Sequence, residues 1–377
     1  MRILVAPDKF RGSLEADEVC KAVEEGIHLA FPDADVRSVP LADGGEGTTQ
    51  ILTRLSKGST VSVKVLDPLG RKITASYGLS ADGTTAFIEM AAASGLKLLN
   101  PSEYNPLLTS TFGTGQLLLD ALAKGVENII LGIGGSATTD AGIGMAAAMG
   151  YRFFDKDENL LEPVGGNLEK IFRIKSSAFS KENQPVKITV ACDVTNPLFG
   201  TNGAAYVYGP QKGADSNMVE KLDQGLRSFT EIASLTFGKN VSEMPGAGAA
   251  GGLGAGCIWF LNAELREGVG IVMEQADIAE QIRHSDLVIT GEGKVDTQTL
   301  SGKVVKGLAD LCKISDVPLA VVCGTLLISP EETHSAGITC AVSLLNQPMD
   351  LDAAQADAFR LVKEATFNLV RLFFSRK

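Results

Sequence analysis

Histidine and cysteine, which supply most metal sites and many nucleophile sites, are sparse in this sequence. Its 377 residues include three histidines, at positions 28, 284 and 334, too scattered to indicate a histidine metal site or a Ser-His-Asp triad. The six cysteines form no C-x-x-C pair and no zinc-finger spacing, and several lie in apolar runs such as residues 321–323. We therefore expect reduced, mostly buried thiols and a cytoplasmic protein.

Positive charge is also scarce, because 34 lysines and arginines face 45 aspartates and glutamates, which gives a net charge of −11. This balance argues against a general nucleic-acid binder and against a protein of anionic membrane surfaces. Long apolar runs are missing as well: residues 3–6 are too few for a signal peptide, and the uncharged window 244–263 contains six glycines, which suits a membrane helix poorly. The expected partners are small molecules, and self-association into a homo-oligomer is left open.

The length exceeds the size at which a single hydrophobic core usually stops growing, so two domains are expected. Strand and helix patterns alternate up to about residue 58 and again from residue 284, which predicts a discontinuous doubly wound, Rossmann-like or flavodoxin-like α/β domain of residues 1–58 and 284–377. Between them, alternating apolar and polar residues at 60–89 predict an antiparallel meander. Residues 59–283 are therefore predicted to be an inserted α+β domain with a mixed sheet.

Polar, glycine-rich loops follow several of the predicted strands. The clearest is residues 286–303, where an apolar run opens into a loop with Gly291 and Gly293 among charged residues. Such loops at the carboxyl ends of parallel strands bind ligands, and we expect them to meet in a cleft between the two domains. They carry carboxylates (Asp8, Asp43, Glu46, Asp140, Asp193, Glu292 and Asp296) and cations (Lys9, Arg11, Lys212, Lys294 and Lys303).

Carboxylates on loops hold Mg²⁺, and cations with backbone amides hold phosphates, so this set fits a small-molecule kinase. No G-x-x-x-x-G-K-[ST] motif is present. One alternative is a dehydrogenase, because residues 132–137 fit G-x-G-x-x-A after a predicted strand, with Asp155 about 20 residues further on. A second alternative is a non-enzymatic protein that binds a sugar acid in a two-domain cleft, although such a protein has little need for carboxylates beside lysines.

Blocks along nearly the whole chain resemble those of the type-1 glycerate kinase family, and they occur in its order. These are APDKFRGSL (6–14), ADGGEGT (42–48), FIEMAAASGL (87–96), GTG (113–115), GIGGSATTD (132–140), CDVTNPL (192–198), GPQKGA (209–214), PGAGAAGGLGA (245–255) and VITGEGKVDTQTLSGK (288–303). The resemblance implies ATP-dependent phosphorylation of D-glycerate, typically to 2-phosphoglycerate, in a two-domain α/β enzyme with its active site between the domains. It also implies that residues 132–137 are not an NAD site.

With this family in view, each candidate residue is given a role as a hypothesis. Asp193 would take the proton of the glycerate hydroxyl, although it could instead be a capping residue in a tight turn. Asp43 and Asp296 would act in catalysis by holding Mg²⁺ or its waters. The substrate-binding candidates are Lys9, Arg11, Gly44 and Gly45, with the two cations near the glycerate carboxylate. The nucleotide and phosphate candidates are Lys212, Gly248, Gly251, Gly252, Glu292 and Lys294, although the glycines could serve only close helix packing.

Overall fold

The computed structural model describes residues 1–42, 47–176, 186–300 and 303–375. Its mixture of helices with parallel and mixed sheets confirms the predicted α/β class. Contacts divide the chain into two compact units, Met1–Asp43 with Val269–Lys377, and Gly44–Gly268. We call them unit 1 and unit 2. The domain boundaries expected at residues 58/59 and 283/284 stay a prediction, and Asp43, Gly44, Gly45 and Glu46 lie outside the described residues.

Unit 1 contains a parallel five-stranded sheet. Its strand order is β13-β12-β11-β1-β2, and every neighbouring pair is parallel. The strands are β1 (Arg2–Val5), β2 (Asp35–Ser38), β11 (Leu287–Val295), β12 (Leu319–Leu326) and β13 (Cys340–Ser343). From β1 the chain moves towards one edge and from β11 towards the other, so the topological switch point of the sheet lies between these two central strands.

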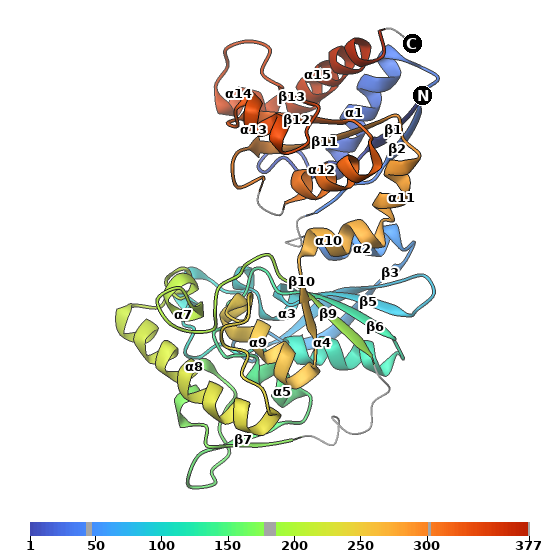
Figure 1. The fold of residues 1–377 in the computed structure, drawn as a ribbon. Helices are drawn as coiled ribbons and strands as arrows, with labels where there is room; N and C mark the ends of the chain where they lie inside the picture. The colour runs from blue at the N-terminus through green and yellow to red at the C-terminus, as the bar shows by residue number, and fades with distance from the viewer. Residues whose placement is uncertain (43–46, 177–185, 301–302, 376–377) are drawn as a thin grey trace. The chain divides into compact units, whose positions relative to one another are not determined.

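Helices cover both faces of this sheet. On one face α1 (Ala16–Ala30) and α15 (Ala358–Phe373) lie side by side and close a core over β1, β11 and β12 (Figure 1). They cross closely at Gly26, where an added Cβ would stand 2.5 Å from the Lys363 carbonyl oxygen. On β11 and β12, α12 (Val304–Ser315) makes further contacts. The remaining helices are α10 (Gly268–Gln275), α11 (Ile278–Arg283), α13 (Pro330–Ser335) and α14 (Leu351–Ala356).

Unit 2 is built on a mixed six-stranded sheet of order β10-β9-β6-β5-β4-β3. The three strands at one edge pair antiparallel, which confirms the predicted meander, and the others pair parallel. The strands are β3 (Ser59–Leu66), β4 (Lys72–Leu79), β5 (Thr85–Glu89), β6 (Asn128–Gly132), β9 (Lys187–Ala191) and β10 (Glu264–Arg266); β7 (Arg152–Phe154) and β8 (Arg173–Lys175) form a separate pair. The carboxyl ends of the parallel neighbours β6 and β9 therefore lie together.

One large apolar core joins this sheet to its helices. The α-helices are α2 (Thr48–Leu55), α3 (Ala91–Ser94), α4 (Phe112–Ala123), α5 (Ile143–Ala148), α7 (Ala204–Tyr208), α8 (Ser216–Phe237) and α9 (Ala249–Leu261), and the 3-10 helices are η1 (Leu96–Leu98), η2 (Pro101–Glu103), η3 (Gly165–Lys170) and η4 (Pro210–Lys212). Helix α8 buries one face, which includes Leu222, Leu226 and Phe229. Within the described ranges, no helix has the length and apolar character needed to cross a membrane.

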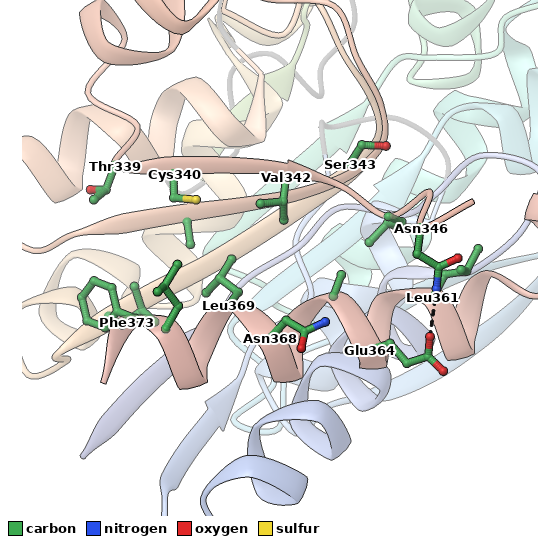
Figure 2. Close-up of a pocket in the computed structure, with 15 residues that line it drawn as sticks. Thr339, Cys340, Val342, Ser343, Asn346, Leu361, Glu364, Asn368, Leu369 and Phe373 are labelled. Carbon is green, nitrogen blue, oxygen red and sulfur yellow. Dashed lines mark hydrogen bonds between the residues drawn. The ribbon is translucent and has the colours of Figure 1, made fainter. Parts of the chain in front are cut away.

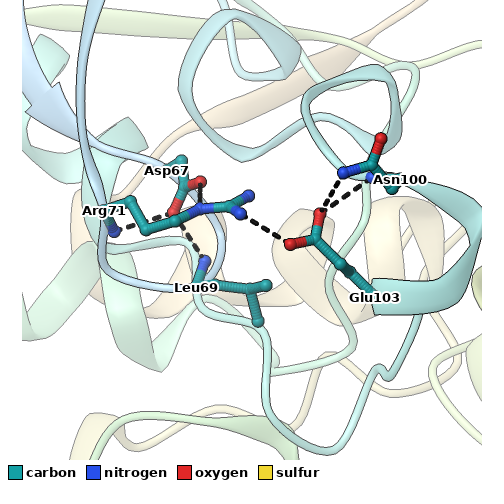
Figure 3. Close-up of polar contacts among 5 residues, drawn as sticks. All are labelled: Asp67, Leu69, Arg71, Asn100 and Glu103. Carbon is teal, nitrogen blue, oxygen red and sulfur yellow. Dashed lines mark hydrogen bonds and ion pairs between the residues drawn. The ribbon is translucent and has the colours of Figure 1, made fainter.

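A polar network fixes the turn between β3 and β4 (Figure 3). The buried Asp67 carboxylate accepts hydrogen bonds from the amides of Leu69 and Arg71 and pairs with the Arg71 guanidinium at 2.5 Å. The same guanidinium reaches Glu103 at 2.6 Å, and Glu103 in turn accepts from Asn100. This turn is thereby tied to η2, a segment more than 30 residues further along the chain.

Candidate active site

A cavity of about 400 Å³ lies within unit 2, beside the carboxyl ends of β6 and β9. Its size is in the range of small-molecule sites. Fourteen residues line it: Leu96, Ile133, Gly134, Gly135, Ser136, Ala191, Cys192, Asp193, Val194, Tyr208, Gln211, Lys212, Ala249 and Ala250. The structure thus brings together three segments predicted to carry chemistry: the one around Asp193, the one around Lys212, and the glycine tract at the start of α9.

The wall that follows β6 is a turn of residues 133–136. Gly135 has a φ of 74°, a conformation that favours glycine, and its carbonyl accepts a hydrogen bond from the Leu96 amide. The Ser136 hydroxyl lies 2.9 Å from the Thr138 hydroxyl and accepts from the Thr138 amide. In the described part of the chain, neither the Gly134 nor the Gly135 amide donates to another group. The turn is therefore held in place while two of its N–H donors stay available.

Lys212 is the cation of this cavity, and its side chain is only 2% exposed. Its ammonium donates a hydrogen bond of 2.6 Å to the Thr138 carbonyl. Burial lowers the pKa of Lys212 to about 7, while the charge of Asp140 opposes that shift. An ammonium has three donors, so the bond to Thr138 leaves donors for an anion in the cavity.

Asp140, at the end of the loop that follows β6, is fully buried. Its Oδ2 accepts from the Thr111 amide and hydroxyl, both at 2.8 Å, and from the Gly144 amide at 3.2 Å, while its Oδ1 accepts from the Gly142 amide at 3.1 Å. Burial raises the pKa of this carboxyl group, and the bonds from Thr111 oppose that shift. Asp140 joins the loop to the starts of α4 and α5 and supplies the negative charge near Lys212.

Asp193 is the second residue after β9, and it is exposed. Its Oδ1 accepts a hydrogen bond of 2.8 Å from the amide of Gly268, the first residue of α10. The sequence left open a capping role for Asp193 in its own tight turn, but this hydrogen bond instead comes from a residue 75 positions further along the chain. A carboxylate offers about four lone-pair sites, so one backbone contact does not exhaust what it can accept.

The glycines at the start of α9 are packed closely against neighbouring segments of the chain. An added Cβ would stand 2.1 Å from the Pro197 carbonyl at Gly248, 2.0 Å from the Thr138 carbonyl at Gly251, and 2.8 Å from Leu198 at Gly252. These distances explain why glycine is needed at the three positions: any side chain would overlap residues 138–141 or 196–198. A further contact of the same glycines with a nucleotide stays a prediction.

Gly251→Ala is expected to lower the free energy of unfolding by about 2–4 kcal/mol, measured by urea denaturation. Two costs combine: the φ of 70° is unfavourable for alanine, and the new methyl group would overlap the Thr138 carbonyl. Gly270→Ala is the matched control, because nothing lies within 4 Å of its Cβ position in α10. The control should stay within about 1 kcal/mol of wild type, and an equal loss in both variants would contradict the packing argument.

In unit 1, the predicted site residues gather at the switch point of the sheet. The loop after β1 lies against β11: the Asp8 amide donates to the Gly291 carbonyl at 2.9 Å, and an added Cβ at Gly293 would stand 3.5 Å from the Arg11 amide nitrogen. Lys9 and Glu292 belong to the same two segments, and Glu292 is buried. The edge of a parallel sheet at such a point is where ligands bind in doubly wound folds.

Lys294 and Asp296, at the end of β11 and just beyond it, form an ion pair of 2.7 Å. The bond from Lys294 is the main reason that the pKa of Asp296 is lowered, with the amides of Thr299 and Gln298 adding to the effect. Lys294 and Asp296 thus already have partners within the chain. Phosphate binding by Lys294 and metal binding by Asp296 stay predictions.

A metal site was predicted at Asp43 and Asp296, and Asp43 lies outside the described residues. Across the described ranges, no three His, Cys, Asp or Glu side chains gather closely enough to hold a metal ion. Mg²⁺ in kinases is usually bound through one or two carboxylates and the phosphate oxygens of the nucleotide. A single carboxylate such as Asp296 would meet that requirement.

A second hollow, of about 390 Å³, lies in unit 1 between α15 and the edge of the sheet (Figure 2). Apolar side chains such as Val342, Leu369 and Phe373 line most of it. None of the predicted site residues is among its lining residues. The cavity beside β6 and β9 is therefore the better candidate for the chemistry.

The sequence offered two interpretations of residues 132–137, as a possible dinucleotide fingerprint and as part of the block 132–140. In that motif the turn opens directly into a helix whose N-terminus binds the pyrophosphate, whereas here α5 begins only at Ile143. The dehydrogenase alternative therefore lacks its defining geometry. The sequence also gave no role to Tyr208, which lines the cavity and whose hydroxyl donates a hydrogen bond of 2.6 Å to Asn196. The neighbouring block 209–214 was the only sign in the sequence that this residue lies near the site.

Comparisons with known proteins agree along the whole chain. The model of the glycerate kinase family matches residues 3–374. The chain is 47% identical to a glycerate kinase of Halalkalibacterium halodurans, with 97% of each chain covered, and 44% identical to a glycerate 2-kinase of Escherichia coli, covering 98% of this chain and 97% of the relative. A crystal structure assigned to glycerate kinase 2 of Salmonella typhimurium LT2 superposes with a TM-score of 0.90 at 41% identity, covering 100% of this chain and 98% of the other.

Proposed function

The chain belongs to the glycerate kinase family, and from that premise we propose that it transfers the γ-phosphoryl group of ATP to D-glycerate, at the 2-hydroxyl, in the cytoplasm. One observation supports this proposal most: Asp193 and Lys212, an acid and a buried cation from different segments, line the same cavity. Phosphoryl transfer needs a group to take the acceptor proton and cations near the phosphate oxygens. This cavity offers one of each.

In the proposed reaction the 2-hydroxyl oxygen of D-glycerate forms a bond to the γ phosphorus. The bond from that phosphorus to the oxygen bridging the β-phosphate breaks, and its electron pair leaves with ADP. The hydroxyl proton passes to the Asp193 carboxylate. Mg²⁺, when bound with ATP, would offset negative charge on the phosphate oxygens.

The remaining roles follow the chemistry of the side chains. Lys9 and Arg11 would bind the glycerate carboxylate together with Gly44 and Gly45, because a carboxylate pairs well with cations and backbone amides. Glu292 and Lys294 would lie near the nucleotide phosphates, and Asp43 and Asp296 near Mg²⁺. It stays a prediction from the family resemblance that residues of both units act on one substrate in a cleft between them.

Incubation with ATP, Mg²⁺ and D-glycerate, followed by ³¹P NMR, tests the proposal. We expect 2-phosphoglycerate and ADP in equal amounts, with no product when glycerate is omitted or when EDTA removes the metal. A 3-phosphoglycerate signal would overturn the choice of hydroxyl. No phosphorylated acid at all would overturn the substrate.

A further inference from the structure

The cavity beside β6 and β9 contains more anion-binding groups than the single lysine that the sequence indicated. Two consecutive backbone amides, those of Gly134 and Gly135, donate to no other group in the described part of the chain, and they line the same cavity as Lys212. Successive N–H donors around a residue with positive φ, here Gly135 at 74°, form a concave site that binds anions. The turn and the lysine therefore present donors to one space.

The strand register brings this anion site next to the proposed base. Gly132 on β6 pairs with Ala191 on β9, so the turn 133–136 and Asp193 follow neighbouring strand ends. In a phosphoryl transfer the attacking oxygen lies between the base and the phosphorus. An anion site beside Asp193 is thus placed to bind the γ-phosphoryl group, which is the one transferred. The α- and β-phosphates would lie further from Asp193.

We propose that the Gly134 and Gly135 amides and the Lys212 ammonium bind the transferred phosphoryl group itself. This inference rests on the proposed kinase function and refines it. The amides and the ammonium donate to the non-bridging oxygens of the γ-phosphate and remain in contact with the same oxygens once they belong to the product. Donors fixed before the reaction stabilise the charge of the transition state without reorganisation.

Lys212 is well suited to this task because it is already held in position. Its bond to the Thr138 carbonyl fixes the ammonium, and Asp140 nearby favours the charged form. Without a ligand, burial lowers the pKa of Lys212 to about 7. A bound phosphate raises that pKa, so binding above pH 7 takes up a proton and weakens as the pH rises.

Lys212→Met removes the ammonium and keeps the length of the side chain, and the affinities of the variant for AMP-PNP, ADP and D-glycerate can be measured by calorimetry. We expect a loss of about 10- to 100-fold for AMP-PNP, as for a charge-assisted hydrogen bond, and less than 3-fold for ADP and for glycerate. Lys221→Met, on the exposed side of α8, is the control and should bind like wild type. An equal loss for ADP, or no loss for AMP-PNP, overturns the inference.

A pH series on the wild-type protein tests the same point even if Lys212→Met fails to fold. The dissociation constant for AMP-PNP should rise about 10-fold or more between pH 7.5 and 9, and a flat profile overturns the inference. The other ionisable groups that face Lys212 or line the cavity are Asp140, Asp193, Cys192 and Tyr208, and burial raises the pKa of both Cys192 and Tyr208. Wild-type protein that binds no AMP-PNP at all refutes the proposed function instead.

Discussion

Asp193→Asn is expected to lower kcat for D-glycerate phosphorylation by about 100- to 10,000-fold, the range contributed by a general base. The variant should keep its fold, because the asparagine Oδ1 can still accept the hydrogen bond that Asp193 Oδ1 receives from the Gly268 amide at 2.8 Å. An amide cannot take up the hydroxyl proton. KM for glycerate and ATP should change by less than about 3-fold, because the substitution removes an interaction made mainly in the transition state.

Asp193→Ala separates the two roles of this residue. Alanine removes both the proton acceptor and the bond to Gly268, so it should lose activity as asparagine does and also lower the thermal unfolding midpoint by a few degrees, the usual effect of losing a cap worth about 1 kcal/mol. Steady-state kinetics and circular dichroism melts measure both effects. Near-normal kcat in Asp193→Asn would remove Asp193 from the chemistry and leave it as a capping residue.

Many strands of the two sheets could be predicted from the sequence because their patterns are local, but the order of the strands and the edge strand β10 could not. Alternating strand and helix signals predicted the parallel strands on either side of α12, and period-two alternation predicted the meander of β3, β4 and β5. No local pattern in the sequence predicts which strands α2 packs against. This helix contacts β4 and β5, and its start is held by Glu89, whose Oε1 accepts from the amides of Gly47 and Thr49 some 40 residues earlier.

Only those residues of the site that act through a charged side chain could be predicted from the sequence. Asp193 and Lys212 could be chosen because a carboxylate and a cation stand out beside glycine-rich loops. The amides of Gly134 and Gly135 could not be chosen, since every residue except proline carries an amide N–H. Only the folded turn shows that these two donate to no other group among the residues that the structure describes. For the same reason the sequence could list Asp140 as a carboxylate but could not show that its four donors come from three separate positions.

Asp140→Ala is expected to be the most destabilising of these substitutions, with a loss of at least about 4 kcal/mol in the free energy of unfolding. The carboxylate is fully buried and accepts four hydrogen bonds, from the amides of Thr111, Gly142 and Gly144 and from the Thr111 hydroxyl. Alanine leaves these donors buried without an acceptor, and each unsatisfied group costs about 1–3 kcal/mol. Because a domain has about 5–15 kcal/mol of stability in total, this loss removes a large part of the margin that keeps the protein folded.

Asp140→Asn should recover only part of this loss, whereas an effect of side-chain volume alone would be recovered in full, because asparagine and aspartate have nearly the same volume. The asparagine amide has one acceptor oxygen, while three of the four bonds converge on the single oxygen Oδ2 and the fourth reaches Oδ1. With its oxygen at the Oδ2 position, asparagine keeps the three bonds from Thr111 and Gly144, but its NH₂ group then faces the Gly142 amide, another donor. Asp155→Ala is the matched surface control, because Asp155 also accepts hydrogen bonds from backbone amides, but at a place where water can replace it. Urea denaturation should show that this substitution lowers the free energy of unfolding by about 1 kcal/mol or less. A comparable loss at both positions would refute the role of burial.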